Sequence, residues 1–465
     1  MDLVCVKAVR ENIEGRLRKT VTCWRLLFYF PFLCLLSACS PESGTTYADQ
    51  DVPIAWGEMS LYITKHTPGN SPTYASREFG YTGLTMYESI VHGSPGYRSL
   101  AGQLNGLDSL PQPEAGQGYN WLLSLNAGQA AILKALYNQT SDENKALIDS
   151  LENEIEVFYR EQAADDQVAE RSIAYGRSVA DAVFEWSKTD GGHRGYLHNF
   201  DKNMVHPSGP GSWKPPLYSQ SFSHFPLHPH WGENRTFVKA NGELPIPYMI
   251  PYDTTAGSPY YQQFMAVYEM DKSLTQEQKE TAIWWGDDPD VTFTPPGHSY
   301  YLATEALKIK RPELIVCAET YARVGMSVAD AFIECWKWKY HFFSERANTY
   351  IPRFIDPTWV SFWPDPPFPA FPSGHAIQAS SAATALASVL GEEIEITDRA
   401  HEGRPRDEVR DVDFTIRSFH AFWEIAQETA DSRFYGGIHT PQDNQVGLDQ
   451  GKVIAGNVIG LKWRE

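Results

Sequence analysis

Three short segments in the last third of the chain combine cationic, imidazole and carboxylate side chains, which together suit the binding of an oxyanion. The first segment contains Lys339 and Arg346. On one helix this spacing would be about two turns and about 10.5 Å of rise, so both cations would share a face and reach a single anion. Alone the pair indicates little, because a Lys and an Arg on one helix face usually form a solvated stripe.

The second segment is Pro372-Ser373-Gly374-His375, directly before a stretch of small and apolar residues, 376–390. A helix that opens here presents free backbone N–H groups and the positive end of its dipole to an anion. The Ser373 hydroxyl can donate to that anion, and Gly374 allows it to approach the backbone closely. His375 stands beside it as a proton donor or acceptor. The alternative is a serine cap with an incidental histidine.

The third segment runs from Ser432 to Asp443. Arg433 offers a planar fork of donors for a tetrahedral oxyanion. Gly436-Gly437 predicts a tight turn, after which His439 could act as a ligand or a nucleophile. Asp443 could accept from the other ring nitrogen of His439 and fix its tautomer.

The three segments in this order, K-x6-R, P-S-G-H and S-R-x5-H-x3-D, closely resemble the signature of a known superfamily. It is the one shared by vanadium-dependent haloperoxidases and type 2 phosphatidic-acid phosphatases. The segments 81–89, 229–232 and 366–372 also resemble the secreted bacterial haloperoxidase-like branch.

The resemblance implies vanadate as the cofactor, phosphate as its competitor, and a role for each matching residue. Five residues would hydrogen-bond the equatorial oxygens of the oxyanion: Lys339, Arg346, Ser373, Gly374 and Arg433. His439 would bind vanadium at the apical position in a haloperoxidase, or attack phosphorus in a phosphatase. His375 would be the acid–base residue, Asp443 would orient His439, and Lys339 would also polarise the peroxide.

Two rings are candidates for a halide pocket. Trp336 precedes Lys339 by three residues and shares its helix face, and Phe368 stands where haloperoxidases resemble one another in carrying a ring or a histidine. A place in the core is as common a role for such rings. The segment departs from the family pattern at Ala347, where a proline normally follows the arginine and fixes the exit from the helix.

An acidic pair elsewhere could join the site. Asp287 and Asp288 could pair with one of the arginines, although we expect an exposed acidic turn there. His298 could line the entrance.

The motifs alone do not separate three functions. A haloperoxidase would oxidise a halide with hydrogen peroxide to hypohalous acid, with an organic molecule left open as a further acceptor. An acid phosphatase would hydrolyse phosphomonoesters through a phosphohistidine. A lipoprotein that only binds phosphate or vanadate would not need the two histidines. The length of the chain and the lack of predicted membrane helices favour the haloperoxidase.

Apolar spacing near three to four residues predicts a mainly α fold, a helical bundle of the haloperoxidase/acid-phosphatase type with long aromatic- and proline-rich loops. No convincing strand ladder is present. We predict helices over 77–91, 127–138, 142–162, 168–187, 275–285, 312–343, 373–390, 413–431 and 444–461, with Ser141 as a cap. The expected organisation is a signal peptide at 1–38, a tether at 39–54, an N-terminal helical region at 55–190, a loop region at 191–262 and a catalytic helical domain at 263–465.

The amino terminus is typical of an export signal. Basic residues precede an apolar run, 26–36, which ends in Leu36-Ser37-Ala38-Cys39. This resembles a bacterial lipobox, which implies a lipid on Cys39 and a protein attached to the cell envelope, at the periplasmic side or the cell surface. A short membrane anchor is the alternative, but the run is shorter than the roughly 18 residues that a span needs.

The net charge of the chain disfavours anionic partners, and the spacing of its cysteines bears on disulfide formation. The chain of 465 residues has 39 Lys and Arg against 58 Asp and Glu, a net charge of −19, which disfavours nucleic acid and anionic lipid. An anionic ligand therefore needs a local cationic pocket. Cys317 and Cys335, if both lie on the predicted helix, are about 27 Å apart and cannot form a disulfide.

Overall fold

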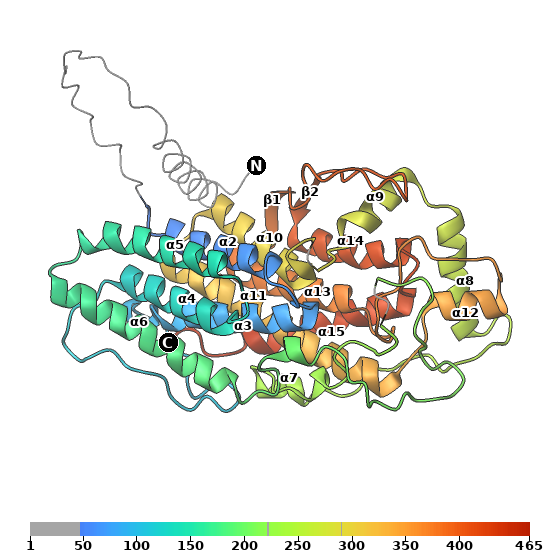
Figure 1. Cartoon of the computed structure of the whole chain (residues 1–465), viewed down its shortest axis with the longest axis horizontal. Helices are drawn as coiled ribbons and strands as arrows, with labels where there is room; N and C mark the ends of the chain where they lie inside the picture. The colour runs from blue at the N-terminus through green and yellow to red at the C-terminus, as the bar shows by residue number, and fades with distance from the viewer. Residues whose placement is uncertain (1–46, 221–222, 290) are drawn as a thin grey trace, which may run out of the picture.

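The computed structural model describes residues 47–220, 223–289 and 291–465. Within these ranges the protein is mainly α-helical, with one small sheet and long loops, which confirms the predicted fold class (Figure 1). The predicted signal peptide and Cys39 lie outside the described residues. In the ranges given, no helix is long and apolar enough to cross a membrane.

The first helices of the described chain form a bundle at one end of the elongated molecule (Figure 1). They are α2 (Asp51–Lys65), α3 (Pro72–Glu88), η2 (Val91–Gly93), α4 (Trp121–Leu136), α5 (Asp142–Arg160) and α6 (Asp166–Ser187). The start of α2 lies inside the stretch predicted as a tether. The hydroxyl of Ser141 accepts from the backbone N–H of Asn144 and caps α5, as predicted.

The described residues between 191 and 262 form long loops with short helical turns. These turns are η3 (Gly195–Leu197), η4 (Trp231–Glu233) and α7 (Lys239–Gly242), and α8 (Pro259–Lys272) begins near the end of the region. Buried rings fasten the loops: Trp213 packs edge-on against Phe343, and Trp231 stacks on His228.

The remaining helices carry the three chemical segments. They are α9 (Gln276–Trp284), α10 (Thr294–Lys310), α11 (Leu314–Phe342), α12 (Ala347–Phe354), α13 (Gly374–Leu390), α14 (Phe422–Tyr435) and α15 (Pro441–Ile459). The sequence pattern does not indicate α8 or α12, because α8 carries rings on several sides and α12 contains Pro352. Cys317 and Cys335 both lie on α11 as buried free thiols, as predicted.

The two strands β1 (Glu393–Asp398) and β2 (Arg417–Ala421) pair antiparallel, with Ile396 opposite Phe419. The predicted helix over 413–431 is therefore wrong for its first residues, and α14 begins only at Phe422. The signal for β1 was the alternation Glu393-Ile394-Glu395-Ile396, whose period of two is that of a half-buried strand.

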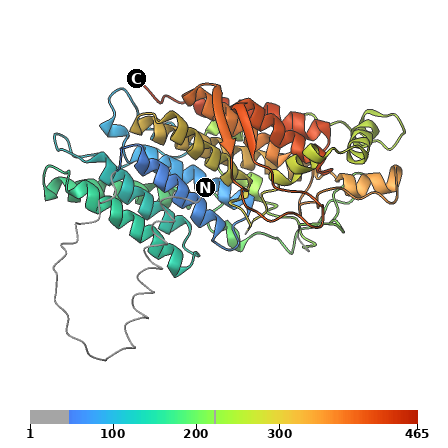
Figure 2. The same ribbon diagram turned by 90° about the horizontal axis from the view of Figure 1, so that it is seen from above.

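One apolar core, which reaches from Val52 to Trp463, joins the two halves of the chain. The junction is formed by α10 and α11, which pack against α2 and α3. In Figure 2 the gold helices of the middle of the chain lie between the blue amino-terminal helices and the red carboxyl-terminal ones. At the crossing of α3 and α11 the backbones touch: a Cβ added at Gly83 would lie 2.4 Å from the carbonyl oxygen of Tyr321, and one added at Gly325 would lie 2.4 Å from that of Phe79. This contact holds α11 against the first bundle.

Candidate active site

Lys339 and Arg346 do not share a helix, which corrects the expectation from their spacing. α11 ends at Phe342, and Phe343 adopts the left-handed conformation with φ of 48°. Ser344 then pairs with the neighbouring loop in a bridge, so extended pairing replaces the helix. Lys339 lies in the last turn of α11, and Arg346 is the extended residue that precedes α12.

Both cations nevertheless converge on the proline-rich segment 366–372. The Nζ of Lys339 donates to three of its carbonyl oxygens, and Arg346 donates to two. They share the carbonyl of Pro369, at 3.1 Å from Lys339 and 3.3 Å from Arg346. Arg346 also donates from Nη1 to the carbonyl of Ile438 at 2.9 Å, which links it to the third segment.

The amino end of α13 meets the amino end of α15 beside these cations. The backbone N–H of Ser373 donates to the carbonyl of Asp443 at 3.0 Å, and its hydroxyl accepts from Ala376 as the helix cap. A Cβ added at Gly374 would lie 4.0 Å from the Cε of Lys339, so this end of the helix faces the lysine. The first N–H groups of a helix have no carbonyl partner within it and can bind an anion.

Arg433 lies in the last turn of α14 and is fully buried. Its Nη1 is 3.3 Å from Nε2 of His375, and its Nη2 donates to the carbonyl of Ala282 at 3.1 Å. A guanidinium only donates, so Nε2 of His375 accepts and the neutral ring carries its proton on Nδ1. The predicted tight turn follows, with φ of 73° at Gly437.

His439 is held by the same carboxylate that caps α15. Oδ2 of Asp443 accepts from Nδ1 of His439 at 3.0 Å and from the backbone N–H of Thr440 at 3.1 Å. Thr440 in turn accepts from the N–H of Asp443 and completes a capping box. The ring therefore carries its proton on Nδ1, and Nε2 is left with a lone pair for a ligand.

Burial moves the pKa of every cation here downward, and repulsion from Arg346 adds to this effect at Lys339 and Arg433. Burial lowers the pKa of Lys339 to about 7, against attraction from Cys335 and with repulsion from Arg346. Burial likewise lowers the pKa of Arg346 and of Arg433 to about 10. The pKa of His439 falls well below its ordinary value, through burial first and then through the three cations.

The donor set fits a bound oxyanion such as vanadate or phosphate. In the described part of the chain, the hydrogen-bond partners of the three buried cations are backbone carbonyls and His375, and none is a carboxylate. The Nε of Arg433 is buried without a hydrogen-bond partner. Buried charges are normally paired, so three unpaired cations with a spare donor favour an anion as the missing partner.

The two candidate halide rings lie against the cations. The Trp336 and Phe368 rings are 4.9 Å apart, and the Trp336 indole donates to the carbonyl of Leu227. The Lys339 Nζ is 5.3 Å and the Arg346 guanidinium 5.2 Å from the centre of the Phe368 ring. Phe368 thus forms an apolar surface shared by two of the cations.

The acidic turn after α9 corrects a second expectation. Asp287 is buried rather than exposed, and His298 is buried between two carboxylates instead of lining an entrance. Asp288, partly buried, lies near Arg433: burial raises its pKa to about 6, against the attraction of that guanidinium.

Sequence reasoning misses the backbone carbonyls of segment 366–372, which receive most of the donors of Lys339 and Arg346. The only sequence signal for these carbonyls is the run of prolines, because proline supplies a backbone carbonyl but no N–H. Sequence reasoning also misses Asp365, a fully buried carboxylate near Arg346.

Comparisons with known proteins agree with this geometry. Residues 319–462 match the family model of the VCPO second helical-bundle domain, a range that contains all three chemical segments. A crystal structure described as the first bacterial vanadium-dependent iodoperoxidase is similar over 90% of this chain and 98% of its own, with 28% identity and a TM-score of 0.77.

Two structures of bacterial vanadium-dependent chloroperoxidase share the fold at lower identity. The apo form has a TM-score of 0.64 and 15% identity over 85% of this chain and 94% of its own. The holo form has a TM-score of 0.60 and 14% identity over 89% of this chain and 92% of its own. No curated protein matches the chain.

Three findings agree. Three buried cations lie beside an oriented histidine, the matching domain contains all three segments, and the fold is shared along most of the chain. Residues 319–462 therefore carry the VCPO second helical-bundle domain, and the chain has the fold of bacterial vanadium-dependent haloperoxidases.

Proposed function

We propose that this protein oxidises a halide ion with hydrogen peroxide to hypohalous acid, with vanadate as its cofactor. The observation that carries the proposal is a set of three fully buried cations, Lys339, Arg346 and Arg433, around an oriented histidine. Among the residues that the structure describes, no carboxylate forms an ion pair with them. The similarity to a vanadium-dependent iodoperoxidase extends over 90% of the chain, the first bundle included, and supports the peroxidase over the phosphatase.

Each residue has a role that its surroundings support. The three cations would balance the charge of the oxyanion, and the Ser373 hydroxyl and the N–H of Gly374 would donate hydrogen bonds to it. His439 would bind vanadium through Nε2, because Nδ1 donates to Asp443. When bound, vanadate supplies a Lewis-acidic centre that activates peroxide.

His375 would move the protons of hydrogen peroxide. Burial first, and then Arg433, hold its pKa well below the ordinary value, so the ring is neutral near pH 7. Its Nε2 faces Arg433 and is an acceptor, which is the state that a general base requires.

The experiment that tests the proposal reconstitutes metal-stripped protein with orthovanadate and measures halide oxidation with peroxide. Iodide, bromide and chloride are offered in turn. We expect activity that requires vanadate and that phosphate suppresses by competition. We expect iodide to react most readily, because it is the easiest of the three to oxidise.

His439→Ala should remove activity by a factor of about 10³ or more, the scale seen when a catalytic histidine is lost. His420→Ala is the matched control, because this ring is exposed on β2 and pairs with an exposed Glu395. Full turnover in His439→Ala contradicts the site. Hydrolysis of p-nitrophenyl phosphate with no vanadate-dependent halide oxidation contradicts the peroxidase and supports the phosphatase.

The halide pocket is tested by Phe368→His. A ring that lies beside the reacting peroxide should change the ratio of iodide to bromide turnover when it is replaced. An unchanged ratio with retained activity removes Phe368 from the pocket.

The proposal includes export and attachment to the cell envelope through a lipid on Cys39. It rests on the sequence Leu36-Ser37-Ala38-Cys39 after a basic and apolar leader. Labelling with a radioactive fatty acid and fractionation test it. Cys39→Ser should lose the label and the membrane association, and a labelled Cys39→Ser protein contradicts it.

A further inference from the structure

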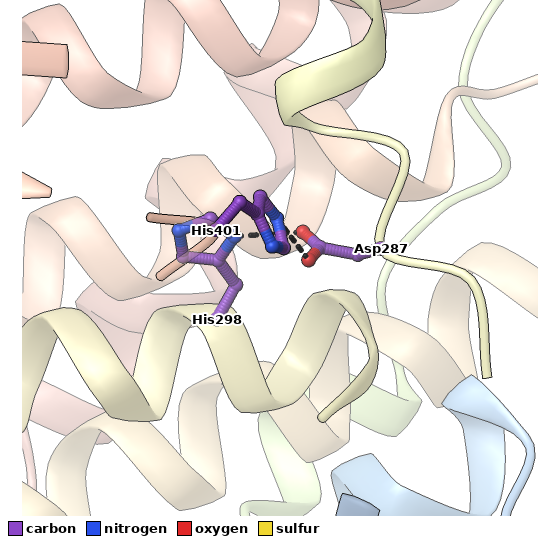
Figure 3. Close-up of side chains that lie close together, drawn as sticks. All are labelled: Asp287, His298 and His401. Carbon is purple, nitrogen blue, oxygen red and sulfur yellow. Dashed lines mark hydrogen bonds and ion pairs between the residues drawn. The ribbon is translucent and has the colours of Figure 1, made fainter. Parts of the chain in front are cut away.

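Asp287, His298 and His401 form a compact cluster outside the oxyanion pocket. They come from three separate segments: the turn after α9, the helix α10 and the loop after β1. All three are buried, and one ligating atom from each lies within 4.8 Å of the others. Figure 3 shows both imidazoles directed at the Asp287 carboxylate.

The ring of His298 is held as metal-binding histidines are. Its Nε2 is 2.8 Å from Oδ2 of Asp398, and that oxygen also accepts from the Trp284 indole at 2.7 Å. Oδ1 of Asp398 accepts from the backbone of Ala400. The anchored Asp398 thus fixes the ring and directs Nδ1 at Asp287, 2.7 Å away. A carboxylate on the far nitrogen is the usual arrangement behind a metal-ligating histidine.

Two atoms at the centre of the cluster face each other without a hydrogen bond. Oδ1 of Asp287 and Nε2 of His401 are 3.1 Å apart, yet in the described part of the chain neither has a hydrogen bond. Buried polar atoms are nearly always satisfied. A cation between these atoms and Nδ1 of His298 would satisfy both.

The charge of the cluster also favours a cation. With neutral imidazoles, Asp287 and Asp398 bring two buried negative charges, and their only ion pairs within the described ranges are to His298 and His401. A proton on His298 would cancel one charge and leave the two central atoms unsatisfied. A divalent cation cancels both charges.

We propose that Asp287, His298 and His401 bind a divalent transition-metal ion of the zinc class, at a site separate from the oxyanion pocket. Imidazole nitrogen and carboxylate oxygen suit such ions. The separations of 2.7 and 3.1 Å are near the roughly 3.4 Å expected between neighbouring ligands about zinc, given bonds of about 2.1 Å.

The ion would have a structural role, because complete burial leaves no room for a substrate. It would tie the turn after α9 to α10 and to the loop after β1. Asp288, the next residue in that turn, lies near Arg433. The metal would therefore brace one wall of the oxyanion pocket.

The test is the metal content of the purified, vanadate-loaded protein after exhaustive dialysis, measured by mass spectrometry. We expect one equivalent of a divalent transition metal per chain in addition to vanadium. His401→Ala and Asp287→Asn should lose it, while His420→Ala should retain it. Replacement by Co²⁺ should give the intense visible bands of a low-coordinate site, and His401→Ala should lose these bands.

His439→Ala separates the two sites, because it should lose vanadium and keep the divalent metal. Wild-type protein that binds no divalent metal after dialysis against ZnCl₂ overturns the proposal, as does His401→Ala with full metal content. If that variant does not fold, Asp398→Asn serves instead: it should weaken zinc affinity about 10- to 100-fold. Unchanged affinity in a folded Asp398→Asn protein also overturns it.

Discussion

His375 and His439 have the same tautomer, with the proton on Nδ1, but different neighbours determine it. Arg433 donates to Nε2 of His375, and Asp443 accepts from Nδ1 of His439. Both rings therefore have an unprotonated Nε2, which in His375 faces Arg433, and burial keeps both neutral. One ring is then available to accept a proton and the other to bind a metal.

Asp443→Asn tests this control of the tautomer. The amide can offer its own N–H to the ring and stabilise the wrong tautomer of His439. We expect vanadate affinity to fall about 10- to 100-fold, as for other residues behind a metal ligand. Titration of activity with vanadate measures it. Thr440→Val is the control, because it removes a cap and should lower stability by about 1 kcal/mol while affinity changes less.

Lys339 should give oxyanion binding its own pH dependence. The pKa of the buried amine is lowered to about 7, so above pH 7 the oxyanion-free protein loses this charge, and binding must then take up a proton. The affinity of the wild-type protein should fall by up to about tenfold per pH unit above 7 through this group.

The matched variant is Lys339→Gln, which keeps a polar side chain without a titratable charge. The slope of log affinity against pH between 8 and 9 should be lower by about one than in the wild type. Phosphate binding by calorimetry measures both slopes. Equal slopes would show that Lys339 does not change its protonation on binding.

The three motifs predict which side chains lie together, because their residue types and their order are those that bind a single anion. The same reasoning is wrong about Asp287. A Gly-Asp-Asp-Pro turn is typical of an exposed loop. Asp287 pairs with the nearby His298, but the other groups that draw the two carboxylates inward are distant: His401 beside Asp287 and Arg433 near Asp288. Those partners lie more than a hundred residues along the chain.

At the element scale, long amphipathic helices are the predictable part. Their apolar period is regular, and α5, α6 and α11 begin and end within a few residues of expectation. The break between α11 and α12 is not predictable, because no proline or glycine marks it. Pairing of Ser344 with a remote loop determines it.

The crossing of α3 and α11 gives a test of packing. Gly325→Ala would place a methyl group 2.4 Å from the backbone oxygen of Phe79, so one helix must move. We expect a loss of about 1–3 kcal/mol in the free energy of unfolding. Gly456→Ala is the control on exposed α15 surface, with open space around it, and should gain about 0.5–1 kcal/mol. Urea denaturation compares them.

At the scale of the whole molecule, the charge distribution is polarised. The chain carries a net charge of −19, yet it buries three cations in one cluster, where no carboxylate of the described residues hydrogen-bonds to them. The oxyanion-free protein bears the cost of that burial, and anion binding relieves it. Stability and cofactor loading should therefore be coupled.

Thermal unfolding measures this coupling. Vanadate at a hundredfold excess over its Kd should stabilise the protein by about 2.7 kcal/mol. Arg433→Met should remove much of this gain and should itself be as stable as the anion-free wild type or more stable, because an apolar side chain replaces an unpaired charge. Arg464→Gln is the control, since its side chain is 60% exposed. A full vanadate shift in Arg433→Met contradicts the coupling.

Asp443 has two structural roles, and this affects how related sequences are interpreted. One oxygen both closes the first turn of α15 and holds the ring of His439. A descendant that had lost all chemistry would still be selected to keep this carboxylate for folding alone. Its presence is a marker of ancestry, whereas the unpaired cations, which only destabilise a protein with no anion to hold, are the better marker of a working catalyst.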